Sequence, residues 1–130
     1  ADLVIGDSGE GALANAQLKQ YVGASKVFQV QYGASAKSPL KWNGRDRYMV
    51  DRTTMIDNFL MFVKKGGVVY PNAACSRPAF DDMLNVYEEV TMTGKKVWRH
   101  APSQPDDALH AQIFAWIGYK ILFQNMEFYA

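Results

Sequence analysis

Apolar residues recur along the chain in short runs and in helix-like spacing, and this pattern predicts strands and helices in alternation. An apolar run at residues 3–5 leads into the turn sequence of residues 6–9, which indicates the end of a strand. Residues 10–21 have the apolar spacing of a helix, and Gly23 is a typical helix stop. Residues 26–32 alternate between apolar and polar side chains, which predicts a second strand.

The middle of the chain predicts a loop, a helix and a short strand. Residues 33–47 are rich in glycine, serine, proline and asparagine, and we interpret them as a loop. Asp51 is a suitable N-cap for a helix that runs to about Lys65, where two glycines follow. Residues 68–70 are apolar and precede a proline, so we expect a third strand there.

The last part of the chain predicts a helix, a hairpin and a long final helix. The helix over residues 76–89 has Pro78 near its first position, where proline is well tolerated. Residues 90–98 fit a hairpin, and residues 106–124 fit the final helix. A strand followed by a helix, repeated four times, predicts a single α/β domain that covers residues 1–130.

The first strand and the last helix are expected to form the centre of this domain. We predict that residues 3–6 lie in the middle of the sheet and that the final helix packs against them. In that helix Ile113, Trp116 and Ile117 share one apolar face. We therefore expect these three side chains to be buried.

The composition indicates a compact domain without disulfides. Of the 130 residues, 48% are hydrophobic and 21% are charged, close to the average of globular proteins. The single cysteine, Cys75, excludes an intramolecular disulfide and a cysteine-rich zinc site. No apolar run is long enough for a membrane helix, and we expect a cytosolic protein. The net charge of +1 is not that of a strongly basic DNA-binding domain, so local charge clusters must decide that question.

Two adjacent carboxylates, Asp106 and Asp107, stand where the final helix is predicted to begin. Acidic residues at such a position cap free backbone N–H groups and interact favourably with the helix dipole. Carboxylates held side by side are also suited to bind a cation. The sequence leaves both interpretations open.

Asp7 stands at the predicted C-terminal end of the first strand. Functional groups of α/β sheets lie beyond the carboxyl ends of the strands, where a carboxylate can face another one on a packed helix. Two such groups bind hard cations such as Mg²⁺. The alternative is a turn aspartate that is hydrogen-bonded to the backbone of Ser8 and Gly9.

Histidine and basic residues are the candidates for phosphate contacts. His110 follows Asp107 by about one helical turn, so the two side chains share a face. His100 precedes the same helix. The remaining candidates are cations that can neutralise DNA phosphates, namely Arg52, Lys64, Lys65 and Arg99. For each of these residues, a structural or solvent-exposed position is the alternative.

Four segments resemble the large terminase subunits of tailed phages, in the order DLVIGDSGEG, VDRTTMIDNFLMFVKKGGVVYP, FDDMLNVYEEV and PDDALHAQIFAWIGY. The most specific match is DDALHA at the start of a late helix, followed by DRT at the start of an earlier one. The resemblance spans nearly the whole chain. It implies the C-terminal nuclease domain of that family, which has an RNase H-like fold with a mixed sheet flanked by helices. That domain cuts concatemeric viral DNA with acidic residues and divalent metal.

The resemblance also assigns site residues. Asp7 matches the second acidic position of the family's active site, and Asp106 and Asp107 match the third. These three are the expected catalytic and metal-binding residues, with Mg²⁺ or Mn²⁺ as the cofactor. The first acidic position, an aspartate on an earlier strand, has no counterpart in this sequence, and neither has the ATPase half with its Gly-rich phosphate loop. The chain thus resembles a terminase fragment truncated at its N-terminus, which we expect to bind metal weakly and to cleave DNA poorly.

The function implied by the resemblance is two-metal hydrolysis of double-stranded DNA, without sequence specificity, in the cytoplasm of a bacterial host cell. We expect the carboxyl groups of Asp7 and Asp107 to lie roughly 4–8 Å apart, as ligands that flank such a site. One alternative is a non-catalytic DNA-binding or assembly module of the same fold, which forms homo-oligomers through an exposed sheet edge. The other is an unrelated α/β domain whose acidic residues only cap helices.

Overall fold

The computed structural model describes residues 2–9, 11–124 and 127–128, and these form an α/β fold with a mixed sheet. Its strands are β1 (Val4–Asp7), β2 (Val27–Tyr32), β3 (Leu40–Trp42), β4 (Arg47–Val50), β5 (Val86–Val90) and β6 (Lys96–His100). Its helices are α1 (Ala12–Val22), α2 (Arg52–Lys64), α3 (Ala73–Asn85) and α4 (Asp107–Leu122), with a short 3-10 helix, η1 (Ala24–Lys26).

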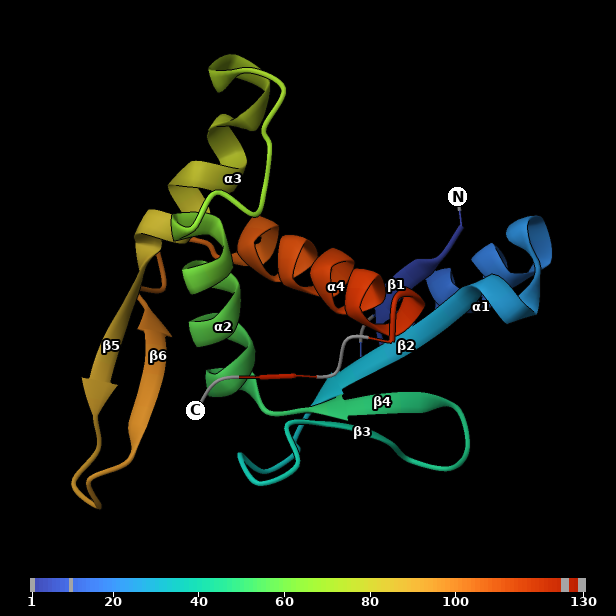
Figure 1. Cartoon of the computed structure of the whole chain (residues 1–130), viewed down its shortest axis with the longest axis horizontal. Helices are drawn as coiled ribbons and strands as arrows, with labels where there is room; N and C mark the ends of the chain where they lie inside the picture. The colour runs from blue at the N-terminus through green and yellow to red at the C-terminus, as the bar shows by residue number, and fades with distance from the viewer. Residues whose placement is uncertain (1, 10, 125–126, 129–130) are drawn as a thin grey trace.

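The main sheet has the strand order β1-β2-β4-β3 (Figure 1). Strands β1, β2 and β4 are parallel, whereas β3 is antiparallel to β4. The prediction that residues 3–6 form the centre of the sheet is therefore wrong, because β1 is an outer strand of the described sheet. The inner positions belong to β2 and β4, whose Val30 and Val50 are completely buried.

Helices α1 and α4 cover opposite faces of β1 (Figure 1). Successive residues of a strand point to opposite faces. A side chain at Gly6 would collide with Asn15 of α1, and a side chain at Gly118 of α4 would come within 2.8 Å of Ile5. Ile5 and Asp7 therefore share the face of β1 that α4 covers.

The core lies between the sheet, α2 and α4. The largest fully buried side chains come from these elements: Val30, Val50, Met55, Ile56, Phe59, Leu109, Ile113 and Ile117. Of the three residues predicted to form the buried face of the final helix, Ile113 and Ile117 are completely buried and Trp116 is 7% exposed. That prediction is confirmed.

Three details of the predicted secondary structure are wrong. The presumed loop over residues 33–47 contains β3 and the first residue of β4, which pair through a tight turn. Residues 68–70 form no strand, because they run along α4 without a neighbouring strand, and the Tyr70 hydroxyl donates a hydrogen bond to Gln112 there. Pro78 lies inside α3 rather than near its start, since Asn72 caps that helix earlier in the chain.

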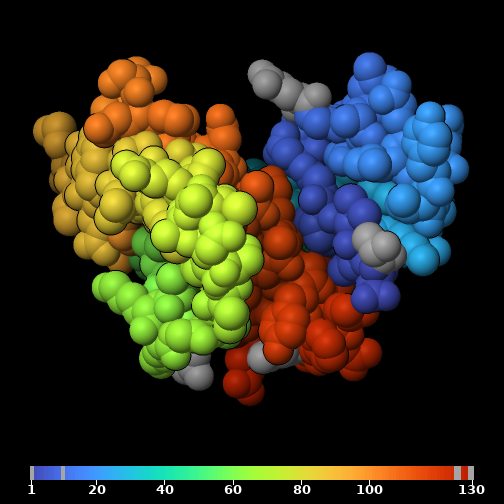
Figure 2. Space-filling view, turned by 90° about the horizontal axis from the view of Figure 1, so that it is seen from above, coloured from blue at the N-terminus to red at the C-terminus, as the bar shows by residue number. Residues whose placement is uncertain are grey.

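The predicted hairpin is confirmed, but it begins at Val86, where β5 starts to pair with β6, so the prediction that residues 86–89 continue the preceding helix is also wrong. It lies on the side of α2 away from the main sheet (Figure 1). Seen from above, α4 forms the central band of the molecule, between α3 on one side and the blue N-terminal segment on the other (Figure 2). Among the described residues, no helix combines the length and apolar character needed to span a membrane.

Candidate functional site

A cavity of about 440 Å³ opens at the carboxyl end of β1, where the end of β2 and the first turns of α4 meet it. It is lined by Ile5, Gly6, Asp7, Tyr32, Asp107, His110, Ala111 and Phe114. The surface is hollowed at this place, between the dark-blue N-terminal segment and the orange start of α4 (Figure 2). The cavity brings together one residue from each acidic segment predicted from the sequence, Asp7 and Asp107.

Asp7 is the last residue of β1, and the turn that follows fixes it from two sides. Its Oδ2 accepts a hydrogen bond from the Gly9 N–H at 2.9 Å, and its carbonyl oxygen accepts one from the Asn15 amide at 2.7 Å. Gly11 allows the chain to pass close by, because a side chain there would come within 2.7 Å of the same carbonyl. Asp7 is thus both a turn aspartate and a cavity residue, so the two interpretations of this residue from the sequence do not exclude each other.

Asp107 is the first residue of α4 and is exposed. In the described part of the chain, no donor is hydrogen-bonded to its carboxylate. One free N–H group of α4 is satisfied from another helix, because the buried Asp82 of α3 accepts a 2.6 Å hydrogen bond from the Ala108 N–H. Asp107 therefore remains open to the cavity, close to the positive end of the helix dipole.

Asp106 has a different environment from its neighbour. It is 6% exposed, it does not line the cavity, and its side chain makes no cap hydrogen bond to α4. Its Oδ2 accepts hydrogen bonds from Arg52 at 3.4 Å and from Nε2 of His110 at 3.0 Å, while its Oδ1 lies 3.6 Å from Nε2 of His100. The structure thus gives two adjacent aspartates two separate positions.

Burial changes the protonation behaviour of the groups around Asp106. It lowers the pKa of His110, although the nearby Asp106 carboxylate opposes this change. Burial also raises the pKa of Tyr32, and the negative charges of Asp106 and Asp7 add to the rise, while Arg52 opposes it. Near neutral pH, both side chains are therefore uncharged hydrogen-bonding groups.

His100 is affected in the opposite direction. Its Nδ1 is hydrogen-bonded to the carbonyl oxygens of Gln104 at 2.8 Å and Ala101 at 3.0 Å. Carbonyl oxygens accept only from a protonated nitrogen, so these bonds raise the pKa of His100, with a further contribution from Asp106. The chain thus contains two histidines whose pKa values move apart.

The two arginines that were candidates for phosphate contacts, Arg52 and Arg99, both pair with other residues of the protein. Arg52 donates a 2.7 Å hydrogen bond to the carbonyl of Trp98 and pairs with Asp106, so it holds β6 to the start of α4. Arg99 pairs with Glu89 across the hairpin at 2.9 Å, and both side chains are about half exposed. Neither arginine lines the cavity.

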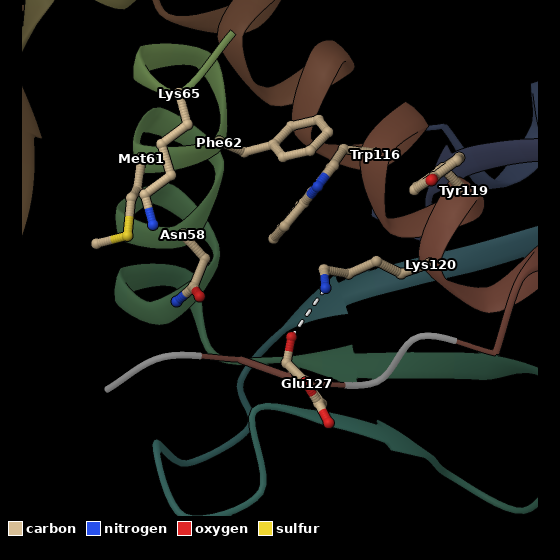
Figure 3. A pocket seen from close by; sticks show the side chains of 8 residues that line it. All are labelled: Asn58, Met61, Phe62, Lys65, Trp116, Tyr119, Lys120 and Glu127. Atoms are coloured by element: carbon tan, nitrogen blue, oxygen red, sulfur yellow. Dashed lines mark hydrogen bonds between the residues drawn. The ribbon is translucent and has the colours of Figure 1, made fainter. Parts of the chain in front are cut away.

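Lys65 lines a second cavity, of about 280 Å³, between α2 and the far end of α4 (Figure 3). There the Nζ of Lys120 donates a 2.8 Å hydrogen bond to the carbonyl of Glu127. Lys120 is about 20 Å along the helix axis from Asp107, at 1.5 Å per residue. Lys65 and its neighbour Lys64 are thus not brought to the Asp7–Asp107 cavity. The lining residues are Asn58, Met61, Phe62, Lys65, Trp116, Tyr119, Lys120 and Glu127.

The residues suited to hold a cation in the first cavity are Asp7 and Asp107. Among the described residues, no group of three or more metal-binding side chains is found. Mg²⁺ keeps several water ligands and is often bound by one or two carboxylates plus substrate phosphates, so this donor set fits a hard cation. Zinc, which takes three or four protein ligands, does not fit it. The predicted separation of roughly 4–8 Å between the two carboxyl groups stays a prediction.

Two contributors to this region were missed from the sequence, Tyr32 and Asp82. Tyr32 alternates with Phe28 and Val30, and this pattern indicates only an apolar strand face. Its place at the end of β2, parallel to β1, is the signal that could have identified it, because ends of parallel strands meet at one sheet edge. For Asp82, which caps a helix 26 residues further along the chain, the sequence carries no comparable signal.

Comparisons of the chain with protein-family models, with curated proteins and with solved structures gave no match. The resemblance to terminase nuclease domains therefore stays a prediction that rests on the motifs in the sequence. The fold stands as α/β with a mixed sheet and four α-helices in the described residues.

Proposed function

We propose that this chain provides the site of a divalent-metal-dependent endonuclease that cleaves double-stranded DNA, like the terminase nuclease domains that it resembles. The observation that carries the proposal is the cavity shared by Asp7 and Asp107. One carboxylate comes from the end of a parallel strand and the other from the first turn of the helix packed on it. This is the location where α/β sheets commonly place their functional groups. An RNase H-like arrangement of the sheet is part of the same proposal.

In this proposal the two cavity carboxylates bind the cation and the buried one supports them. When bound, Mg²⁺ or Mn²⁺ would activate a water molecule and stabilise the leaving oxygen of the phosphodiester. Asp7 and Asp107 would hold the cation through their carboxylate oxygens. Asp106 fixes the start of α4 through Arg52 and His110, and so determines where Asp107 stands.

DNA would be bound through its backbone and without sequence specificity. Among the described residues, no lysine or arginine lines the cavity, so the cation itself would provide the main contact to the scissile phosphate. Affinity for DNA falls with salt in proportion to the number of phosphates that basic side chains neutralise. We therefore expect DNA binding to be weak and to depend little on salt. The proposed setting is the cytoplasm of a bacterial host cell during viral DNA packaging.

Paramagnetic broadening by Mn²⁺ tests the metal site. In ¹⁵N-labelled protein, substoichiometric Mn²⁺ should first broaden the amide signals around Asp7 and Asp107. The Asp7→Asn and Asp107→Asn variants should each lose this broadening. Asp81→Asn is the matched control, because Asp81 is an exposed aspartate on α3 that is paired with Arg77. Broadening that is centred elsewhere, or that survives both cavity substitutions, would contradict the proposed site.

Plasmid nicking in millimolar Mn²⁺ tests the activity. We expect slow nicking by the unaltered chain and by Asp81→Asn, and none by Asp107→Asn. The rate is expected to be low because the resemblance implies three acidic positions and this sequence has counterparts of two of them. Nicking at equal rates by the unaltered chain and Asp107→Asn would show that the cavity is not the catalytic site.

Assembly is a second candidate function, and the position of β1 favours it. In the described sheet, no strand pairs with the outer edge of β1. Open strand edges readily add a further strand from another chain. An assembly module should form dimers that grow with concentration in light scattering, with or without metal. A monomer at all concentrations would count against this role.

A further inference from the structure

Tyr32, His110 and Asp106 form one continuous chain of hydrogen bonds from the cavity wall to the buried start of α4. The Tyr32 hydroxyl lies 2.5 Å from Nδ1 of His110, and Nε2 of the same ring lies 3.0 Å from Oδ2 of Asp106. The Tyr32 and His110 rings also meet edge to face, with centroids 5.3 Å apart. The three side chains come from β2 and α4, which are far apart in the sequence.

The direction of these hydrogen bonds follows from the chemistry of the three groups. The Asp106 carboxylate, which also pairs with Arg52, can only accept. The proton of the neutral His110 ring must therefore be on Nε2, which leaves Nδ1 as an acceptor. Burial lowers the pKa of His110, which favours the neutral ring in the hydrogen-bond chain seen here. Tyr32 is then the donor to Nδ1.

This direction determines what Tyr32 presents to the cavity. Its only hydroxyl proton is directed toward His110, so its oxygen lone pairs remain available to accept, and Tyr32 lines the same cavity as Asp7 and Asp107. A hydroxyl in this state accepts a hydrogen bond from a water molecule. Nucleophile–base–acid chains of this kind, in which the third group orients the base, recur in hydrolytic sites.

We propose that Tyr32 and His110 form a proton relay, positioned by Asp106, that removes a proton from the attacking water of the proposed hydrolysis. This inference rests on the proposed function. As the water oxygen bonds to phosphorus, its proton passes to the Tyr32 oxygen while the Tyr32 proton passes to Nδ1 of His110. The bond from phosphorus to the leaving ester oxygen breaks, and that oxygen takes a proton from solvent. The imidazolium, held by Asp106, returns its proton through Tyr32 to solvent.

The tautomer of His110 tests the relay independently of any cleavage. In a long-range ¹H–¹⁵N spectrum at pH 7.5, we expect His110 to carry its proton on Nε2 and to show a hydrogen-bonded acceptor Nδ1. Tyr32→Phe should shift the Nδ1 signal toward that of a free acceptor. The chain has two histidines, and His100→Gln assigns the spectrum. A proton on Nδ1, or an Nδ1 signal unchanged in Tyr32→Phe, would overturn the relay.

The nicking rates of variants distinguish failure of the relay from failure of the proposed nuclease function. Tyr32→Phe should lower kcat roughly 10²-fold or more, the range of general base catalysis, with KM and Mn²⁺ broadening unchanged. Tyr48→Phe is the matched control, because Tyr48 lies on β4 against Phe28 and Trp42, outside the cavity. Nicking that needs Asp107 but not the Tyr32 hydroxyl overturns the relay alone. If the unaltered chain does not bind Mn²⁺ at the cavity but His110 has the expected tautomer, the nuclease site is overturned, whereas the hydrogen-bond chain stays in place.

Discussion

The two adjacent aspartates at the start of α4 should contribute very differently to stability when each is replaced by alanine. Asp106 is buried and accepts hydrogen bonds from Arg52 and His110, whereas Asp107 is exposed in the cavity. Asp106→Ala leaves both donors without their acceptor. Asp107→Ala removes a carboxylate to which no described residue donates a hydrogen bond.

The sizes of the two effects follow from these surroundings. Breaking a buried ion pair by removing one partner costs about 3–5 kcal/mol, and a hydrogen bond to a charged group contributes about 1.5–3 kcal/mol. The Arg52 side chain is 33% exposed and can be rehydrated, so we expect about 2–4 kcal/mol for Asp106→Ala. For Asp107→Ala the loss is the helix-dipole interaction, about 0.3–1 kcal/mol. The change in unfolding free energy should therefore stay within about 1 kcal/mol.

Urea denaturation followed by tryptophan fluorescence measures both variants under one set of conditions. A change of 1 kcal/mol corresponds to roughly 4 °C in Tm for a domain of this size, so thermal melts should separate the two variants clearly. Asp106→Asn, which keeps the shape and one acceptor oxygen, should fall between Asp106→Ala and the unaltered chain. Equal destabilisation by Asp106→Ala and Asp107→Ala, or the reverse order, would refute the assignment of structural and cavity roles.

Three further predictions follow from the same contacts. His110 should titrate below 6.5 and His100 above it in NMR. As the pH falls, His110 is protonated in the unfolded state before it is protonated in the folded state, so its contribution to stability is complete above pH 6.5 and is lost as the pH falls through its folded pKa. His100 behaves in the opposite way: its contribution is complete below pH 6.5 and is lost as the pH rises through its folded pKa. Gly6→Ala should destabilise the fold by about 1–3 kcal/mol in urea and disturb the amide signals of Asn15, with which its side chain would collide. Asp82→Ala should cost about 1–2 kcal/mol, and Asp82→Asn less, because the Ala108 N–H at the start of α4 loses its buried acceptor. Unchanged stability in the Gly6 or the Asp82 variant would contradict the contact assigned to that residue. Two histidines that titrate together would contradict their different surroundings.

The parts of the fold that follow local rules could be predicted from the sequence. The apolar face of α4 and the strand end at Asp7 depend on periodicity and on turn residues that stand close together in the chain. The N-cap role of Asp51 is equally local, and its carboxylate accepts a hydrogen bond from the Thr54 N–H at 3.0 Å. The strand order could not be predicted in this way, because the central place of β2 depends on pairing with both β1 and β4.

The difference between Asp106 and Asp107 shows where sequence reasoning about the site ends. Both residues have the same chemistry and neighbouring positions, and only the approach of Arg52 and His110 makes one of them buried. Arg52 lies 54 residues earlier in the chain and is itself fixed by the backbone of β6. The pairing of Tyr32 with His110 spans 78 residues and is likewise decided by the packing of α4 on β2.

A crystal structure of the chain soaked in Mn²⁺ tests the central claim most directly, through the anomalous scattering of the metal. We expect a peak in the cavity within bonding distance of carboxylate oxygens of both Asp7 and Asp107, with the remaining ligands supplied by water. The Asp106 carboxylate should stay bonded to Arg52 and His110 in the same crystal. Metal bound to Asp106, or a cavity without a peak in crystals that bind Mn²⁺ elsewhere, would contradict the account.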